Sequence, residues 1–169
     1  MFDKHQHFRK RLKNSHPAVV VVVKWLNQFG IAHADEPKCA PSVKEKDDYI
    51  DNGDIYFTRH PEQPWQKVEV KQQFRQWAGK EDFPFPEVTV VACDRFEYTT
   101  PKTAVAYIIV NKDMTVGAVV PVKATREHWI KKPTYDRERD EWYDAWYCPI
   151  MKDEQQLVHF YSLTVKETP

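Results

Sequence analysis

The pattern of apolar and polar positions predicts one helix near the start of the chain, followed by several short strands. Residues 18–29 repeat apolar side chains at helical spacing, and Gly30 follows as a left-handed terminator. The sequence at 14–17, Asn-Ser-His-Pro, is typical of a helix start, with a capping side chain and a proline in the first turn. Five consecutive valines favour a strand by propensity, but the apolar spacing beyond them favours the helix. We expect a first strand at 31–34 and a polar loop or irregular edge at 35–53.

Two further strands are predicted at 53–57 and 68–71. The connection between them is short and contains two prolines, so the strands should be antiparallel neighbours. Side chains alternate between the two faces of a strand. Glu69 and Lys71 therefore share one face of the second strand, while Val68 and Val70 point to the other.

The rest of the chain predicts a mixture of short elements. A short helix is expected at 72–80, with Gly79 near its end, because prolines bar a helix soon afterwards. The later elements are a largely buried strand at 87–93, a hairpin of strands at 104–111 and 116–122, one or two short helices or a long excursion at 124–147, and a last strand at 157–165.

The composition is that of one domain with no strong overall charge. The chain has 169 residues, 41% of them hydrophobic, which suffices for one sizeable core. Its 25 Lys and Arg balance its 25 Asp and Glu, so no global field draws it to nucleic acid or to a membrane, although a local basic patch is not excluded. The three cysteines, at positions 39, 93 and 148, favour neither a disulfide framework nor a zinc site. We therefore expect a cytoplasmic protein without a signal peptide or a membrane anchor.

The first residues of the chain are basic. Residues 1–13 hold five Lys and Arg against one Asp. One interpretation of residues 1–16 is a helical arm whose basic face meets phosphate, and the other is a solvated terminus.

The order of these elements resembles the PD-(D/E)XK nuclease superfamily, which has the restriction-endonuclease-like fold. The pieces that carry the resemblance are the helix end and strand at 25–31, Gly53-Asp54-Ile55 and Glu69-Val70-Lys71. The resemblance spans roughly residues 17–95, within a single domain over 1–169, and it matches no subfamily. It implies an α/β (α+β) fold with a central mixed sheet flanked by helices.

The resemblance also implies a metal-dependent site. Asp54 and Glu69 would bind Mg²⁺, with Mn²⁺ as a substitute, and the backbone carbonyl of Val70 would be a further ligand. Lys71 would orient or polarise the attacking water. Independently of the family, Mg²⁺ prefers oxygen ligands, keeps several waters, stabilises charge on a phosphoryl transition state and lowers the pKa of bound water.

Some features depart from the family pattern or leave a choice open. Gly53 stands where the motif name has proline, and the predicted helix at 18–29 lacks the acidic residue that some members use for a second metal. Asp51 is the second choice for the acidic ligand, because Asp51-Asn52-Gly53 is typical of a turn. Gln73 shares the face of Glu69 if the strand persists, so it could contact the metal-bound water or a phosphate. The alternatives are that Gln73 starts a helix and that the charged face is only an exposed strand face.

Other candidates are weaker. His60, in the loop between the two strands, could reach a phosphate, but an exposed loop histidine is the simpler interpretation. The basic residues Arg75, Lys80 and Lys131-Lys132 could contact a nucleic-acid backbone, or simply be solvated. The aromatic residues at 129–147 could stack on unpaired bases, although packing in a small core is the preferred interpretation.

The leading hypothesis is a nuclease that hydrolyses phosphodiester bonds in DNA, alone, as a homodimer or in a larger complex. A second is a catalytically inactive module of the same fold that binds nucleic acid or protein. A third is a small structural or inhibitory protein, for example one encoded by a phage.

Overall fold

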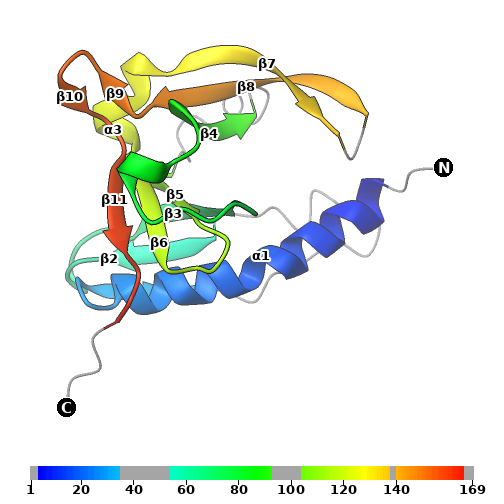
Figure 1. The fold of residues 1–169 in the computed structure, drawn as a ribbon. Helices are drawn as coiled ribbons and strands as arrows, with labels where there is room; N and C mark the ends of the chain where they lie inside the picture. The colour runs from blue at the N-terminus through cyan, green and yellow to red at the C-terminus, as the bar shows by residue number, and fades with distance from the viewer. Residues whose placement is uncertain (1–3, 35–53, 93–103, 138–139, 166–169) are drawn as a thin grey trace.

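The computed structural model describes residues 4–34, 54–92, 104–137 and 140–165. They form an α+β structure in three layers, with a long helix below, a six-stranded sheet in the middle and a three-stranded sheet above (Figure 1). The predicted polar loop at 35–53, with Asp51 and Gly53, and the cysteines at 39 and 93 lie outside the described residues.

The long helix is α1, Lys4–Leu26, which begins much earlier than predicted. The basic segment is itself helical, since its Lys, Arg, Gln and Leu residues favour helix intrinsically. Pro17 therefore lies inside the helix and not in its first turn. The apolar side chains from Ala18 to Leu26 pack on the sheet. The expected helix start at 14–17 was wrong.

Gly30 follows the helix for a reason other than the one predicted. Its backbone is not left-handed. A Cβ at this position would lie 2.3 Å from the carbonyl oxygen of Thr58, so the glycine is needed for the close approach of two backbones. The chain then enters β1, whose Ala32 exchanges two hydrogen bonds with the side chain of Asn27.

The six-stranded sheet, sheet A, has the order β1-β2-β3-β5-β6-β11. β3 and β5 are parallel, and the other neighbouring pairs are antiparallel, so the sheet is mixed as predicted. Its strands are β1 (Ile31–His33), β2 (Ile55–Thr58), β3 (Gln66–Gln72), β5 (Ala106–Val110), β6 (Val116–Pro121) and β11 (His159–Ser162). The predicted strands at 31–34, 53–57, 68–71 and 157–165 and the hairpin at 104–122 thus correspond to strands in the structure.

A second sheet, sheet B, packs on the part of the other face of sheet A that β5 and β6 form. It has the order β4-β8-β7, with β4 at Glu87–Ala92, β7 at Ile130–Asp136 and β8 at Glu141–Pro149. Two short helical elements, α3 (Val122–Thr125) and η3 (Arg126–His128), lead into β7, and a small two-stranded sheet pairs β9 (Met151–Lys152) with β10 (Gln155–Gln156). Of the expected mixed sheet flanked by helices, the sheet is confirmed, but among the described residues one long helix packs on it and strands form the layer opposite; most of 124–147 is a long hairpin.

The segment after β3 is not the helix that we predicted at 72–80. The strand pairing continues instead, because the backbone N–H of Gln73 donates to the carbonyl of Val110. Further along, the carbonyl of Arg75 accepts from Lys112, and the carbonyl of Trp77 accepts from the Asn111 side chain. These partners replace the bonds of a helix, and only the short 3-10 turn η2 (Lys80–Asp82) follows.

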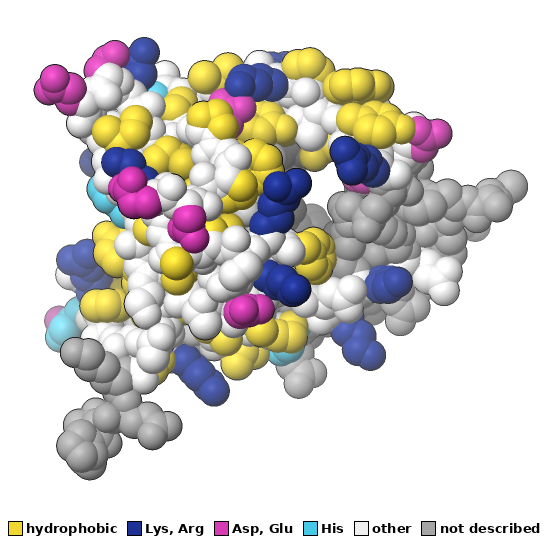
Figure 2. All heavy atoms as spheres, viewed as in Figure 1, with side chains coloured by type: hydrophobic (Ala, Val, Ile, Leu, Met, Phe, Trp, Pro, Cys, Tyr) yellow, Lys and Arg dark blue, Asp and Glu magenta, His cyan; other side chains and the backbone are white. Residues whose placement is uncertain are grey.

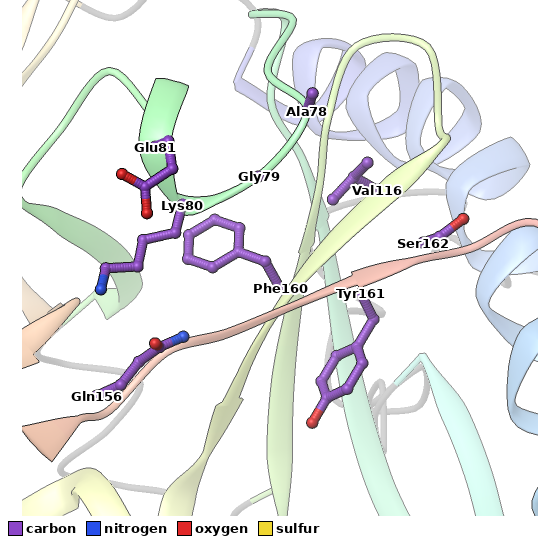
Figure 3. A pocket seen from close by; sticks show the side chains of 9 residues that line it. All are labelled: Ala78, Gly79, Lys80, Glu81, Val116, Gln156, Phe160, Tyr161 and Ser162. Atoms are coloured by element: carbon purple, nitrogen blue, oxygen red, sulfur yellow. The ribbon is translucent and has the colours of Figure 1, made fainter.

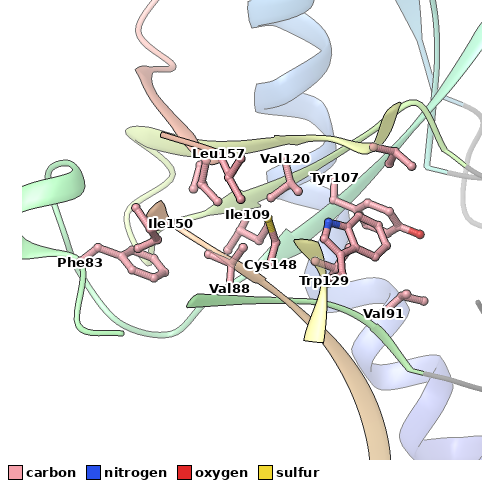
Figure 4. Packing of buried hydrophobic residues seen from close by; sticks show 14 of the residues in the cluster. Phe83, Val88, Val91, Tyr107, Ile109, Val120, Trp129, Cys148, Ile150 and Leu157 are labelled. Atoms are coloured by element: carbon pink, nitrogen blue, oxygen red, sulfur yellow. The ribbon is translucent and has the colours of Figure 1, made fainter. Parts of the chain in front are cut away.

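Alternation along the strands of sheet A divides the core in two. Ile108 and Val110 of β5 face α1, with Val68 and Val70 of β3 beside them. Tyr107 and Ile109 face sheet B, where they join a larger cluster with aliphatic and aromatic side chains of β4, β6 and β8 (Figure 4). The face of β3 that carries Glu69 and Lys71 is therefore the face directed towards the side of sheet B.

Candidate functional site

The site predicted from the sequence lies on β2 and β3. Their register ends with Ile55 opposite Val68, and Asp54 and Glu69 are the next residues along the two chains. Side chains that are opposite each other in an antiparallel pair share a face, so continuing the ladder by one residue would set Asp54 opposite Glu69. Both residues are half-buried.

Asp54 is tied to the neighbouring strand by its side chain. Its Oδ2 accepts a hydrogen bond from the backbone N–H of Val70 at 2.6 Å. The N–H and C=O of one residue in a strand point to the same side, so the carbonyl of Val70 is also directed towards Asp54. The Asp54 carboxylate and the Val70 backbone are therefore adjacent at the start of β2.

Lys71 lies on the same face as Glu69, next to the aromatic ring of β5. The parallel register places Glu69 beside Tyr107 and Lys71 beside Ile109. The Lys71 Nζ lies 6.0 Å from the centre of the Tyr107 ring, at the outer limit of a cation–π contact. Tyr107 is only 6% exposed and meets Trp129 edge-on, so the ring next to Lys71 is held in place by the core.

Gln73 continues the alternation of Glu69 and Lys71, as predicted, but its side-chain amide oxygen already accepts a hydrogen bond within the protein. The Oε1 of Gln73 accepts a hydrogen bond from the indole Nε1 of Trp77 at 3.1 Å. Trp77 is fully buried in the cluster between the two sheets. Gln73 does not start a helix, and its contact with a metal-bound water stays a prediction.

The chemistry of the donor set fits a hard cation. Among the described residues, no group of three or more His, Cys, Asp or Glu side chains is placed to hold a metal ion. Two carboxylates and a backbone carbonyl nevertheless suit Mg²⁺, which completes its coordination with water. Asp54, Glu69 and Val70 could hold such an ion.

The same face carries an aromatic group that the sequence analysis missed. The rings of His33 and Tyr56 stack at 5.3 Å between centroids, and Trp65 meets His33 edge-on at 5.0 Å. Tyr56 is two residues from Asp54 on β2, so both side chains leave the same face. Strand alternation could have revealed the place of Tyr56, but nothing in the sequence indicates that Trp65 folds back onto His33.

The weaker candidates have varied surroundings. His60 is exposed in the loop between β2 and β3, which agrees with the interpretation of an exposed loop histidine. Lys132 pairs with Glu87 at 2.5 Å and Lys131 with Asp144 at 3.8 Å, and the Arg75 guanidinium lies over the Phe85 ring. These contacts account for three of the four basic side chains that the sequence suggested.

The aromatic residues of 129–147 divide into two groups. Trp129 is buried in the core between the two sheets, and the partly buried Trp146 packs against this core. Trp142 is 70% exposed and contacts Tyr135 near the end of the hairpin. Figure 2 shows hydrophobic side chains gathered over this upper layer of the molecule.

An open pocket of about 440 Å³ lies elsewhere, between the segment before η2 and β11. The Phe160 ring lies beneath Gly79 and Lys80, and Tyr161 points away from them (Figure 3). No residue of β2 or β3 lines this pocket. Its lining offers one lysine and one glutamate and no convergent set of catalytic groups, so it is not the site that we develop below.

Comparison with models of protein families, with curated proteins and with solved structures finds no significant match. Within the described residues, no helix is both long and apolar enough to cross a membrane.

Proposed function

We propose that this protein is a metal-dependent nuclease that hydrolyses phosphodiester bonds in DNA. The observation that supports the proposal is the antiparallel pairing of β2 with β3, whose register ends one residue short of Asp54 and Glu69, with Lys71 on the same face of β3 as Glu69. In the proposal, these three charged side chains have complementary roles and are held by a rigid sheet, as a preorganised site requires.

The arrangement of the first elements supports a restriction-endonuclease-like fold. A helix packs on the antiparallel strands β1, β2 and β3, and a parallel strand, β5, adjoins β3. One part differs from the order expected from the sequence. The segment at 72–80, where a helix was expected, forms none, and the strand predicted at 87–93 is β4 of the second sheet, so the strand beside β3 is β5.

In this proposal, Asp54, Glu69 and the Val70 carbonyl hold Mg²⁺. When bound, the metal supplies charge stabilisation for the phosphoryl transition state and a more acidic water. The Val70 N–H holds one oxygen of the Asp54 carboxylate and so fixes this side chain against β3. Lys71 provides a positive charge beside the attacking water, and the buried Tyr107 ring limits where its ammonium can move.

The direct test is cleavage of plasmid and linear DNA with Mg²⁺ or Mn²⁺. We expect Glu69→Gln and Lys71→Met each to lower the rate by about 100-fold or more, as loss of a preorganised charge does. Asp54→Asn should also be inactive but folded, because the amide oxygen can still accept from the Val70 N–H. Glu81→Gln, at an exposed acid of η2, is the control and should cleave like the wild type. Equal cleavage by all variants would exclude this site.

The second candidate is a module that binds nucleic acid without turnover. It is favoured by the absence, among the described residues, of a third acidic side chain near the carboxylate pair. It predicts no Mn²⁺ binding that depends on Asp54 and Glu69 in a calorimetric titration, together with retained binding of an oligonucleotide.

A further inference from the structure

Three aromatic side chains form a connected group on β1, β2 and the loop before β3. We call His33, Tyr56 and Trp65 the stacking platform. His33 and Tyr56 are nearly parallel, with 20° between their planes, and Trp65 stands at 70° to His33. The β1–β2 register pairs His33 with Tyr56, so the sheet itself sets this stack.

The platform continues the face that holds the carboxylate pair. Tyr56 pairs with Lys67 on β3, two residues along the ladder from the Asp54–Glu69 position. Two residues along a strand span about 7 Å. The platform, the Lys67 ammonium and the carboxylates therefore occupy adjacent places on one side of the sheet.

The platform is open to solvent in spite of its size. Trp65 is 45% exposed and His33 is exposed, while Tyr56 is half-buried. A ring that serves only the core loses most of its exposure, as Trp77 and Trp129 do. Trp65 instead presents an aromatic surface beside a lysine, which suits a ligand that has both a flat apolar part and a negative charge.

We propose that the stacking platform binds an unpaired base of single-stranded nucleic acid, next to the phosphate that approaches Asp54 and Glu69. Base–aromatic stacking tolerates any sequence, and Lys67 supplies a positive charge for the adjoining backbone. The placement of the phosphate rests on the proposed nuclease function, whereas the binding of the base does not. The substrate class would then be single-stranded DNA or RNA, and an intact duplex would bind less well because its bases are stacked inside.

The other exposed aromatic pair serves as a contrast. Trp142 and Tyr135 are also accessible and contact each other, but they belong to the β7–β8 hairpin of sheet B and not to the face that carries Tyr56 and Glu69. Trp142 is therefore a matched control for Trp65, being the same residue type at a more exposed position.

The experiment measures binding without divalent metal, so that cleavage does not enter. The probes are a fluorescently labelled oligothymidylate, an abasic strand of the same length and charge, and a duplex. Fluorescence anisotropy gives the dissociation constants for the wild type, Trp65→Ala, Trp65→Phe and Trp142→Ala, each checked for folding by circular dichroism.

We expect the wild type to prefer oligothymidylate over the abasic strand. Trp65→Ala should weaken oligothymidylate binding by about 5- to 150-fold and leave the abasic strand unchanged, while Trp65→Phe retains most of the affinity. Trp142→Ala should match the wild type. The proposal is overturned if the wild type does not distinguish the two strands or binds neither, if Trp65→Ala binds like the wild type, or if Trp142→Ala loses as much. Base-dependent binding without any nuclease activity would reject the proposed function and keep this inference.

Discussion

The Asn111 side chain provides a stringent test of how the turn between β5 and β6 is held to the segment after β3. Asn111 is fully buried and makes four hydrogen bonds. Its Nδ2 donates to the carbonyl of Trp77 at 2.8 Å and to the Thr115 hydroxyl at 3.0 Å. Its Oδ1 accepts from the backbone N–H groups of Thr115 and Val116 at 2.8 and 3.1 Å. The amide therefore joins two segments that are far apart in the sequence.

Asn111→Ala should lower the free energy of unfolding by about 2–5 kcal/mol. A net hydrogen bond contributes about 1 kcal/mol, and each buried group left without its partner costs more than that. Four bonds are lost together, and water can replace only those nearest the surface. The melting temperature should fall by roughly 4–20 °C, since each kcal/mol corresponds to about 2–4 °C in a chain of this size.

The assay is urea unfolding followed by tryptophan fluorescence. Thr115→Val is the matched comparison, because it removes one of the four bonds and keeps the shape of the side chain. It should cost about 1 kcal/mol. A double variant that is less destabilised than the sum of the two would show that the groups interact. A loss below about 1 kcal/mol for Asn111→Ala would refute the reasoning that these bonds hold the turn.

Two further predictions follow from backbone contact and from burial. Gly30→Ala should destabilise the protein by about 1–3 kcal/mol in the same assay, because the new Cβ would meet the Thr58 carbonyl oxygen. Gly79→Ala is the control and should leave the free energy of unfolding unchanged, because nothing lies within 4 Å of a Cβ at that position. Equal effects of the two substitutions would contradict the role of the close backbone approach at Gly30. Burial raises the pKa of the Cys148 thiol to about 11, so in a variant whose other two cysteines are serine, it should react with a thiol reagent at pH 8 only as fast as the protein unfolds. The unfolded thiol ionises near pH 9, so the stability that the neutral buried thiol contributes is present below that pH and is lost as the pH rises towards 11. Rapid labelling of Cys148 in the native protein would argue against its burial.

Local patterns were sufficient for the strands that form the candidate site. Alternation alone puts Glu69 and Lys71 on one face, because the period of two holds in any sheet. The short connection predicted that β2 and β3 are antiparallel neighbours, and their register ends one residue short of Asp54 and Glu69. These inferences needed no knowledge of distant parts of the chain.

Non-local contacts decided the elements that were predicted wrongly. The segment at 72–80 has a helical pattern, but Trp77 is buried between the sheets and its backbone is bonded to Asn111. The start of α1 was missed for the opposite reason. Its first turns have little apolar pattern to indicate burial, and intrinsic propensity is the only signal for them. The ring contact of Trp65 depends on the path of a loop that no periodicity describes.

The position of β4 has a consequence for how the chain is made. Among the strands that the structure describes, β4 pairs with β8 alone, so its partner is synthesised long after it. Until then the segment Val88-Thr89-Val90-Val91, which has strong β propensity and no charge, has no neighbouring strand in that sheet. Such a segment can associate with other chains before β8 has been synthesised and paired with it. The nascent protein should therefore depend on a chaperone, or on slow translation at low temperature, for a good yield of folded product.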